Sequence, residues 1–169
     1  MDSVAKFAKQ AAFFQDWLLS GTDQESDSAR ECLIRLLELY LAGIQLPPEW
    51  SDELEGRADV ESISNEEWLS AVEATRRLPL DFYKQVFDPT EITSQGPVMG
   101  SLSDDLADIY RDVVTGLRAY EHGELAEAVW EWSFGLHIPW GAHATSAILA
   151  LYWWLCNNSP NHLSDGGTG

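Results

Sequence analysis

The first third of the chain contains two stretches in which apolar residues recur at helical spacing. From Val4 to Leu19 they fall every three or four positions, which predicts a helix with one apolar side. From Asp27 to Ala42 the same spacing predicts a second helix, and Gly43 followed by two prolines predicts its end. Because each predicted helix has one apolar side, we expect the two to share a core. The apolar positions are Val4, Phe7, Ala8, Ala11, Phe14, Leu18, Leu33, Leu36, Leu37, Tyr40 and Leu41.

The middle of the chain alternates between polar segments and short apolar ones. Pro48 to Ser64 is rich in acidic residues and predicts a long loop, either solvated or used for binding. Its last residue and Glu67 match a capping box, which predicts a third helix over residues 65–78. Pro79 is expected to begin a short helix that ends at Phe87. Residues 88–100 contain two prolines and two glycines and predict another loop.

The most regular helical pattern covers Ser101 to Tyr120. On a wheel of about 100° per residue, its apolar and charged positions separate onto opposite sides. Asp105 lies at the boundary between these sides, which distinguishes it from the other acidic residues of this helix. The apolar side comprises Leu106, Ile109, Tyr110, Val113, Leu117 and Tyr120, and the charged side comprises Asp104, Asp108, Arg111, Asp112 and Arg118.

Two further helices are predicted, from Glu124 to Ile138 and from Gly141 to Cys156. Gly123 ends the helix over residues 101–120, and Glu124 begins the next one, so the turn between them is tight. We therefore expect these two helices to lie antiparallel. The last predicted helix is apolar on almost every side, which is typical of a helix in the middle of a bundle. Five of the eight tryptophans fall in these two helices and their junction, and we expect them to form core rather than a ligand-stacking surface.

Together these segments predict an all-α fold, a single-domain helical bundle of six or seven helices over residues 1–157. We expect its core to be a C-terminal antiparallel hairpin of helices plus a buried last helix. Residues 158–169 are polar and rich in glycine, which predicts a flexible C-terminal tail. The length of 169 residues and the 45% share of apolar residues fit one packed domain.

The net charge restricts the partners that this chain can have. With 28 acidic residues against 10 lysines and arginines, the formal net charge is −18. The resulting field repels nucleic-acid backbones and anionic membrane surfaces, so the sequence predicts no nucleic acid and no membrane as partners. A protein partner with a basic or apolar patch fits this charge better.

The N-terminus and the cysteines indicate a cellular compartment. The chain does not begin with a basic segment followed by an apolar run and a cleavage site, which argues against secretion. Cys32 and Cys156 lie far apart in the sequence and are expected to be reduced thiols. We therefore expect a cytoplasmic protein.

Three stretches of sequence occur together in this chain: LLELYLAGIQLP, SDDLADIYRDV and AVWEWSFGLHIPWGAHATSAILAL. Their combination resembles the bacterial family catalogued as domain of unknown function 5063. The resemblance runs from about Cys32 to Leu155 and is strongest between Leu102 and Leu151. It implies an all-helical cytoplasmic protein, and it implies no activity and no catalytic residue.

Two known acidic motifs match the helix over residues 101–120 in part. The string from Asp104 to Asp108 fits the DDxxD pattern by which isoprenoid synthases hold magnesium and diphosphate. However, the chain has no obvious second motif and no lysine or arginine after Arg118 to bind the diphosphate. Helical nucleoside triphosphate pyrophosphatases would pair two of these aspartates with Glu124 and Glu127. In an antiparallel hairpin those pairs lie about 16 Å of helix rise apart, so they would not converge.

The same hairpin geometry predicts a different cluster. It places the start of the helix over residues 101–120 level with the end of the helix over residues 124–138 and with the start of the helix over residues 141–156. Two histidines with one or two carboxylates match the donors of a zinc, manganese or iron site. They also match a general acid–base pair. The predicted ligand-binding residues are Asp105, Asp108, His137, Trp140 and His143, and the candidate ligands of a divalent metal are Asp105, Asp108, His137 and His143.

A structural role explains these residues without a metal. Aspartates near a helix N-terminus are stabilised by the helix dipole, and like-charged pairs on an exposed face cost only a few tenths of a kcal/mol. His137 and His143 would then hydrogen-bond to Asp105 or to a backbone carbonyl and tie together the break at Pro139. Both interpretations stay open at this point.

The sequence therefore leads to two hypotheses about function. The first is a non-enzymatic protein-binding or adaptor module of the bacterial cytoplasm that requires no cofactor. The second is a metal-dependent hydrolase with an Asp/His site at one end of the helical bundle. Nucleophile elbows and phosphate-cradling loops are absent from the sequence, so we do not favour other chemistry.

Overall fold

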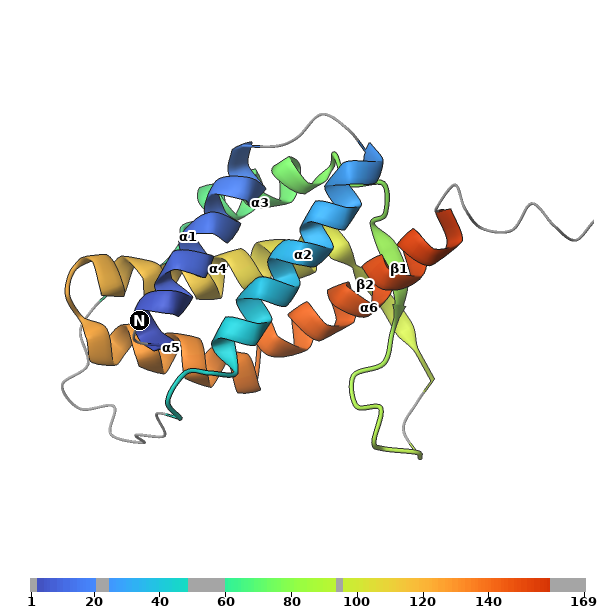
Figure 1. The fold of residues 1–169 in the computed structure, drawn as a ribbon. Coiled ribbons are helices and arrows are strands. Elements are labelled where there is room, and N and C mark those ends of the chain that lie inside the picture. The colour runs from blue at the N-terminus through green and yellow to red at the C-terminus, as the bar shows by residue number, and fades with distance from the viewer. Residues whose placement is uncertain (1–2, 21–24, 49–59, 94–95, 159–169) are drawn as a thin grey trace, which may run out of the picture.

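A computed structural model describes residues 3–20, 25–48, 60–93 and 96–158. These residues form six helices and two short strands (Figure 1). The elements are α1 (Ser3–Ser20), α2 (Glu25–Gly43), α3 (Asn65–Thr75), β1 (Phe82–Gln85), β2 (Val98–Ser101), α4 (Leu102–Glu121), α5 (Leu125–His137) and α6 (Trp140–Asn158). None of the described helices is long and apolar enough to cross a membrane.

The amphipathic segments form helices where the periodicity predicts them. Both ends of α1, α2, α4, α5 and α6 lie close to the predicted bounds, and α4 and α5 form an antiparallel pair joined by a tight turn (Figure 1). The predicted capping box opens α3, because the Ser64 hydroxyl accepts from the Glu67 N–H and the Glu67 carboxylate accepts from the Ser64 N–H at 2.9 Å. The Ser64 N–H and hydroxyl both donate to the Glu67 carboxylate, and these two hydrogen bonds hold the pKa of Glu67 below its usual value.

The segment after α3 differs from the prediction. The short helix expected over residues 79–87 is wrong, because β1 lies there and pairs antiparallel with β2, which occupies the end of the predicted loop over residues 88–100. Along β1, exposed and half-buried residues alternate, as in a strand with one side against the protein. The protein is therefore mostly helical rather than all-α, and its β-hairpin lies in the middle of the chain, not at the C-terminal end.

Two predictions fall outside the described residues. The acidic loop expected from Pro48 to Ser64 lies largely in the segment 49–59, which the structure does not describe. The C-terminal tail expected over residues 158–169 is likewise outside the described residues, apart from Asn158 at the end of α6.

Most of the other elements pack against α4. This helix contacts α1, α3, α5, α6 and β2. Twelve of its twenty residues are buried, and Asp105 is the one carboxylate among them. Because an ionised group is costly to bury without hydrogen bonds, the surroundings of Asp105 constrain how neighbouring elements pack on α4.

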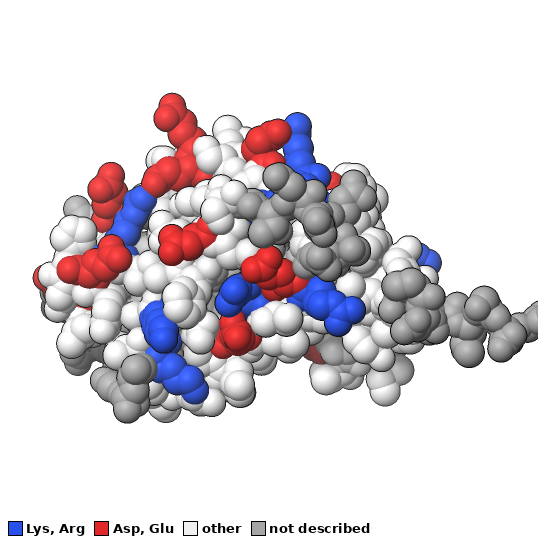
Figure 2. All heavy atoms as spheres, turned by 45° about the horizontal axis from the view of Figure 1, so that its top comes forward, with Lys and Arg blue, Asp and Glu red and all other residues white. Residues whose placement is uncertain are grey.

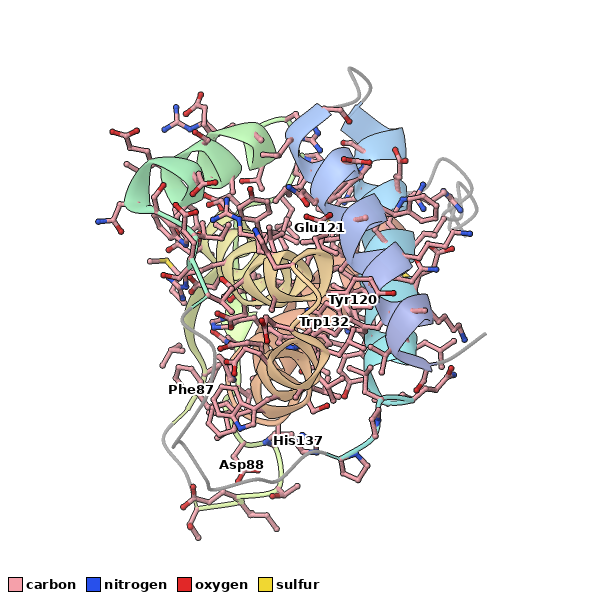
Figure 3. All side chains as sticks on the ribbon, turned by 90° about the vertical axis from the view of Figure 1, so that its left-hand side faces the viewer. Phe87, Asp88, Tyr120, Glu121, Trp132 and His137 are labelled. Atoms are coloured by element: carbon pink, nitrogen blue, oxygen red, sulfur yellow. The ribbon has the colours of Figure 1, made fainter. Side chains whose placement is uncertain are left out.

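Two tryptophans connect α4, α5 and α6 inside the core. Trp132 and Trp140 are fully buried. The Trp132 indole N–H donates to the Val113 carbonyl of α4 at 2.9 Å, and the Trp140 indole N–H donates to the Trp132 carbonyl at 3.0 Å. The Phe7 ring of α1 lies 4.7 Å from the Trp132 ring and 5.9 Å from the Trp140 ring, centroid to centroid. Trp132 also packs near Tyr120 beneath α1 and α2 (Figure 3).

The last helix is not buried on every side, contrary to the prediction. One side of α6 lies in the core, but Leu149, Tyr152 and Trp153 on the other side are 58%, 50% and 57% exposed. This helix contains no Asp, Glu, Lys or Arg. Its outer side is therefore an apolar surface with β1 next to it. The residues that α6 buries are Trp140, Gly141, Ala144, Ala147 and Leu151.

The contact between Gly116 and Trp132 gives a first prediction. A Cβ atom at Gly116 would lie 2.6 Å from Cδ1 of the buried indole. We expect Gly116→Ala to lower the free energy of unfolding by about 1–3 kcal/mol through overpacking, despite the better helix propensity of alanine. Urea denaturation followed by circular dichroism measures the effect. The control is Gly96→Ala, because a Cβ there meets no atom within 4 Å. Equal midpoints for the two variants would contradict the prediction.

Candidate functional site

A hydrogen-bonded pair of Asp105 and His143 lies between α4 and α6. The Nδ1–H of His143 donates to Oδ1 of Asp105 over 2.6 Å. The hydroxyl of Tyr83, on β1, donates to Oδ2 of the same carboxylate. The Asp105 side chain is only 6% exposed, so these two donors replace the water that its carboxylate would otherwise bind. The three residues thereby tie α4, α6 and β1 together.

Asp108 lies beside this pair, one turn further along α4, and is more exposed. Its Oδ2 is 3.7 Å from Nε2 of His143, which is too long for a hydrogen bond. Its Oδ1 accepts from the Trp68 indole N–H at 2.9 Å and from the Arg111 guanidinium at 3.0 Å. Asp108 is therefore engaged with α3 and with its own helix rather than held free for a ligand.

The pKa values of His143 and Tyr83 are both raised beside the Asp105 carboxylate, which favours their protonated forms. The hydrogen bond to Asp105 raises the pKa of His143 above its ordinary value, although burial opposes this, and the charges of Asp105, Asp108 and Asp112 raise it further. Burial, together with the hydrogen bond to Asp105, raises the pKa of Tyr83. A general base needs a pKa near the working pH and an unprotonated form. Both side chains serve as donors to Asp105, which gives them a structural role, and a general acid–base role of His143 through its other ring nitrogen stays a prediction.

The structure places His137 and Trp140 in other surroundings. His137 ends α5, with its Nδ1 2.7 Å from the Ser133 carbonyl oxygen, and lies in a hollow lined by Pro47 and Pro48. Trp140 lies in the core, where its indole donates to α5. The structure thus places His137 and Trp140 apart from the pair of Asp105 and His143. Of the five predicted residues, the structure brings together Asp105, Asp108 and His143.

The metal hypothesis gains no support from this arrangement. Within the described ranges, no group of three or more His, Cys, Asp or Glu side chains is placed so that it could hold a metal ion. Metal binding by Asp105, Asp108, His137 and His143 stays a prediction.

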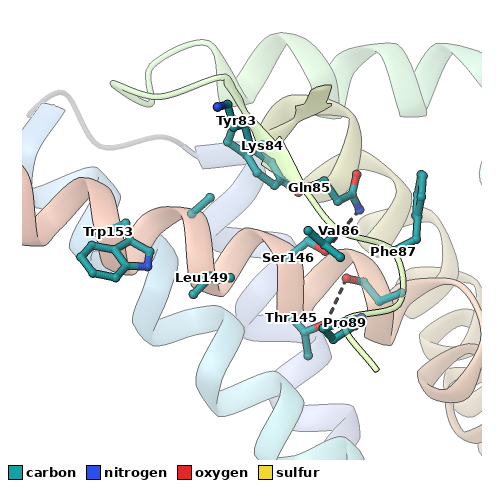
Figure 4. Close-up of a pocket in the computed structure, with 12 residues that line it drawn as sticks. Tyr83, Lys84, Gln85, Val86, Phe87, Pro89, Thr145, Ser146, Leu149 and Trp153 are labelled. Carbon is teal, nitrogen blue, oxygen red and sulfur yellow. Dashed lines mark hydrogen bonds between the residues drawn. The ribbon is translucent and has the colours of Figure 1, made fainter. Parts of the chain in front are cut away.

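A cavity of about 590 Å³ lies between β1 and the outer side of α6 (Figure 4). It is lined mainly by apolar side chains, and the Gln85 amide donates to the Ser146 hydroxyl at 3.2 Å within it. The ring of Tyr83, whose hydroxyl reaches Asp105, forms part of the wall. The lining residues are Tyr83, Lys84, Gln85, Val86, Phe87, Pro89, Ala142, Thr145, Ser146, Leu149, Ala150 and Trp153.

Large apolar side chains are exposed around this cavity. Val86, Phe87, Leu149 and Trp153 are 49%, 77%, 58% and 57% exposed, and we call these four residues the α6–hairpin surface. By contrast, the face over α1, α2 and α3 carries many acidic side chains and several basic ones (Figure 2). Sequence reasoning missed this surface because it predicted a helix in place of β1 and an interior position for α6. The sequence signal that could have revealed this surface was that α6 is apolar on almost every side and contains no Asp, Glu, Lys or Arg.

The six helices of the described residues, with a β-hairpin against α6, define a mostly helical protein that has an apolar cavity at its surface. The model of the family described as "Domain of unknown function (DUF5063)" matches residues 1–156, and the chain belongs to this family. This confirms the resemblance found in the sequence. Protein BF1032 from Bacteroides fragilis, known from a crystal structure, is similar in fold, with a TM-score of 0.73, 21% identity and 96% coverage of both chains. A search of curated proteins finds no match.

The raised pKa of His143 predicts a pH dependence of stability. Protonation of His143 in the folded state stabilises the fold, and this contribution is fully present below the ordinary pKa of 6.5 and is lost as the pH rises through the higher folded value. We expect the difference in unfolding free energy between the wild type and His143→Gln to be largest below pH 6.5 and to shrink above it. Urea denaturation over a series of pH values measures this difference.

The exposed His122 at the C-cap of α4 provides the control for removing an imidazole. The imidazole of His122 contacts the Arg118 carbonyl rather than a buried carboxylate. The stability difference between the wild type and His122→Gln should therefore not depend on pH in the way expected for His143→Gln. A stability difference for His143→Gln that is the same at every pH would argue against a charged imidazole in the folded protein.

Proposed function

We propose that this protein is a non-enzymatic protein-binding module that docks its partner on the α6–hairpin surface. The observation that carries the proposal is the exposure of Val86, Phe87, Leu149 and Trp153 around one cavity. Contiguous exposed apolar patches on soluble proteins mark interaction sites, whereas single exposed apolar residues are ordinary.

The cavity supports a partner that inserts apolar side chains. Its lining is mainly apolar, and burial of such surface contributes roughly 25 cal/mol per Å². Tryptophan is among the residue types that contribute most binding energy at protein interfaces, and Trp153 lines this cavity. A partner that fills the cavity would therefore gain affinity from a few anchoring contacts.

The charge of the chain supports the choice of partner. The net charge is −18, and no lysine or arginine follows Arg118. An acidic partner is repelled at long range, whereas a partner with basic residues around an apolar anchor is attracted. This is the chemistry that we assign to the partner.

The metal-dependent hydrolase has no specific observation in its favour. The Asp105 carboxylate already accepts from Tyr83 and His143, and the Asp108 carboxylate accepts from Trp68 and Arg111. These contacts support a structural role for the cluster, which positions β1 and α6 and so shapes the cavity between them.

A matched pair of substitutions tests the proposed docking surface. Leu149 on α6 and Leu69 on α3 are both 58% exposed, but only Leu149 lines the cavity. We expect Leu149→Asp to reduce recovery of a specific partner from an extract of the source cells at least tenfold, because it places a charge in the docking surface. Leu69→Asp should recover that partner as the wild type does. Quantitative mass spectrometry of the bound proteins makes the comparison.

Both substitutions are at exposed positions, so they should change the unfolding free energy by no more than about 0.5 kcal/mol. Thermal unfolding of each variant verifies this. The proposal fails if every protein that the wild type retains is also retained by Leu149→Asp.

A further inference from the structure

One edge of β1 is unpaired within the described part of the chain. The sheet has two strands, in which Tyr83 lies opposite Gly100 and Gln85 lies opposite Val98. The Leu102 N–H donates to the Asp81 carbonyl at 2.7 Å, and this pair continues the same register. Asp81 and Leu102 therefore form a hydrogen-bonded pair, and this pair determines which of the following residue pairs are hydrogen-bonded.

The same pair identifies the backbone groups at the free edge. Hydrogen-bonded and non-hydrogen-bonded pairs alternate along an antiparallel ladder. Since Asp81 forms a hydrogen-bonded pair, Tyr83 and Gln85 also direct their N–H and C=O groups toward β2. Phe82 and Lys84 direct theirs away from β2, toward the free edge. A row of outward N–H and C=O groups is a template for pairing with another strand.

The cavity lies beside α6, which packs under the face of β1 that carries Tyr83 and Gln85, and it also reaches the free edge of the strand. Successive residues of a strand point to opposite faces, so a cavity under one face would be lined by every second residue. Every residue from Tyr83 to Phe87 lines the cavity. Its opposite wall is a stripe on α6 whose members recur at three- and four-residue spacing from Ala142 to Trp153.

The two walls have similar lengths. The four steps from Tyr83 to Phe87 span at most about 13 Å at 3.3 Å per residue. The eleven helical steps from Ala142 to Trp153 span about 16 Å at 1.5 Å per residue. The cavity is therefore a groove between a strand edge and a helix, and it is long enough for about five residues of an extended peptide.

We propose that this groove binds an extended segment of the partner, which joins β1 as a third strand. This rests on the proposed function of the α6–hairpin surface and specifies how the partner is held. The main chain of the segment hydrogen-bonds to the outward groups of Phe82 and Lys84, and every second side chain packs on Leu149 and Trp153 of α6. Main-chain bonds supply affinity in this mode of recognition, and pockets for alternate side chains supply specificity.

Charge complementarity selects the flanks of the segment. The α6 wall has no charged residue, so it accepts the apolar side chains. Asp81 directly precedes β1, and Asp88 and Glu91 lie in the loop that follows it; all three are exposed. These three negative charges exceed the single positive charge of Lys84. A complementary partner segment therefore carries lysine or arginine on either side of its alternating apolar positions.

Lys84→Pro tests the strand pairing directly. Proline lacks the backbone N–H, and residue 84 directs that group to the free edge rather than into the ladder with β2, where proline is tolerated. The matched control is Lys84→Ala, which removes the same charge and keeps the N–H. Thermal unfolding of both variants should show that the hairpin is retained.

The probe is a displayed library of random heptapeptides, selected on the wild-type protein. We expect enriched peptides with alternating apolar residues and basic flanks, which bind Lys84→Pro at least tenfold more weakly than Lys84→Ala. Amide hydrogen exchange should slow at Phe82 and Lys84 when such a peptide binds. Exchange at Tyr83 and Gln85 should change little, because their N–H groups already bond to β2.

The outcomes separate this inference from the proposed function. If Leu149→Asp loses the partner but Lys84→Pro binds as Lys84→Ala does, the docking surface stands and strand addition is overturned. If neither substitution affects binding, both proposals fail. If the protein alone forms dimers in sedimentation experiments that Lys84→Pro dissociates, the edge pairs with a second copy of the chain and the peptide proposal is overturned.

Discussion

The buried carboxylate of Asp105 constrains more of this structure than any other single group. It accepts hydrogen bonds from β1 through Tyr83 and from α6 through His143, and it lies on α4, which contacts α1, α3, α5 and α6. Loss of either donor would leave a buried anion partly unsatisfied, at a cost of about 1–3 kcal/mol or more. The positions of the hairpin and of α6 therefore depend on each other. The groove between them is a consequence of this dependence.

The core on the other side of α6 explains how that helix can leave apolar residues exposed. Trp132 and Trp140 bind α4, α5 and α6 together through two indole hydrogen bonds, and Trp140 fits against glycines on both flanks. A Cβ atom at Gly135 would lie 2.6 Å from its ring, and one at Gly43 would lie 2.7 Å from it. Because this packing holds α6 by its inner side, its outer side is available for binding.

The sequence predicted the parts of the fold that depend on helical periodicity. The helix over residues 101–120 was the clearest case, since charged and apolar positions separate cleanly along α4. The hairpin was missed because β1 and β2 have four residues each, too few to show a period, and Pro79 also fits a helix start. The outer side of α6 was misjudged because its exposed residues are as apolar as its core residues, and the sequence alone does not distinguish the two. His143 was correctly placed near Asp105, whereas His137 was not, since a sequence does not give the direction of the chain after a proline break.

The unpaired edge of β1 also bears on how the protein behaves at high concentration. An open strand edge beside an apolar groove promotes contact between copies of the same chain. The net charge of −18 opposes such contact, because like-charged molecules repel one another before their edges can meet. That repulsion acts over roughly 8 Å at physiological ionic strength and weakens as salt is added. The net charge that favours the proposed basic partner thus also opposes self-association.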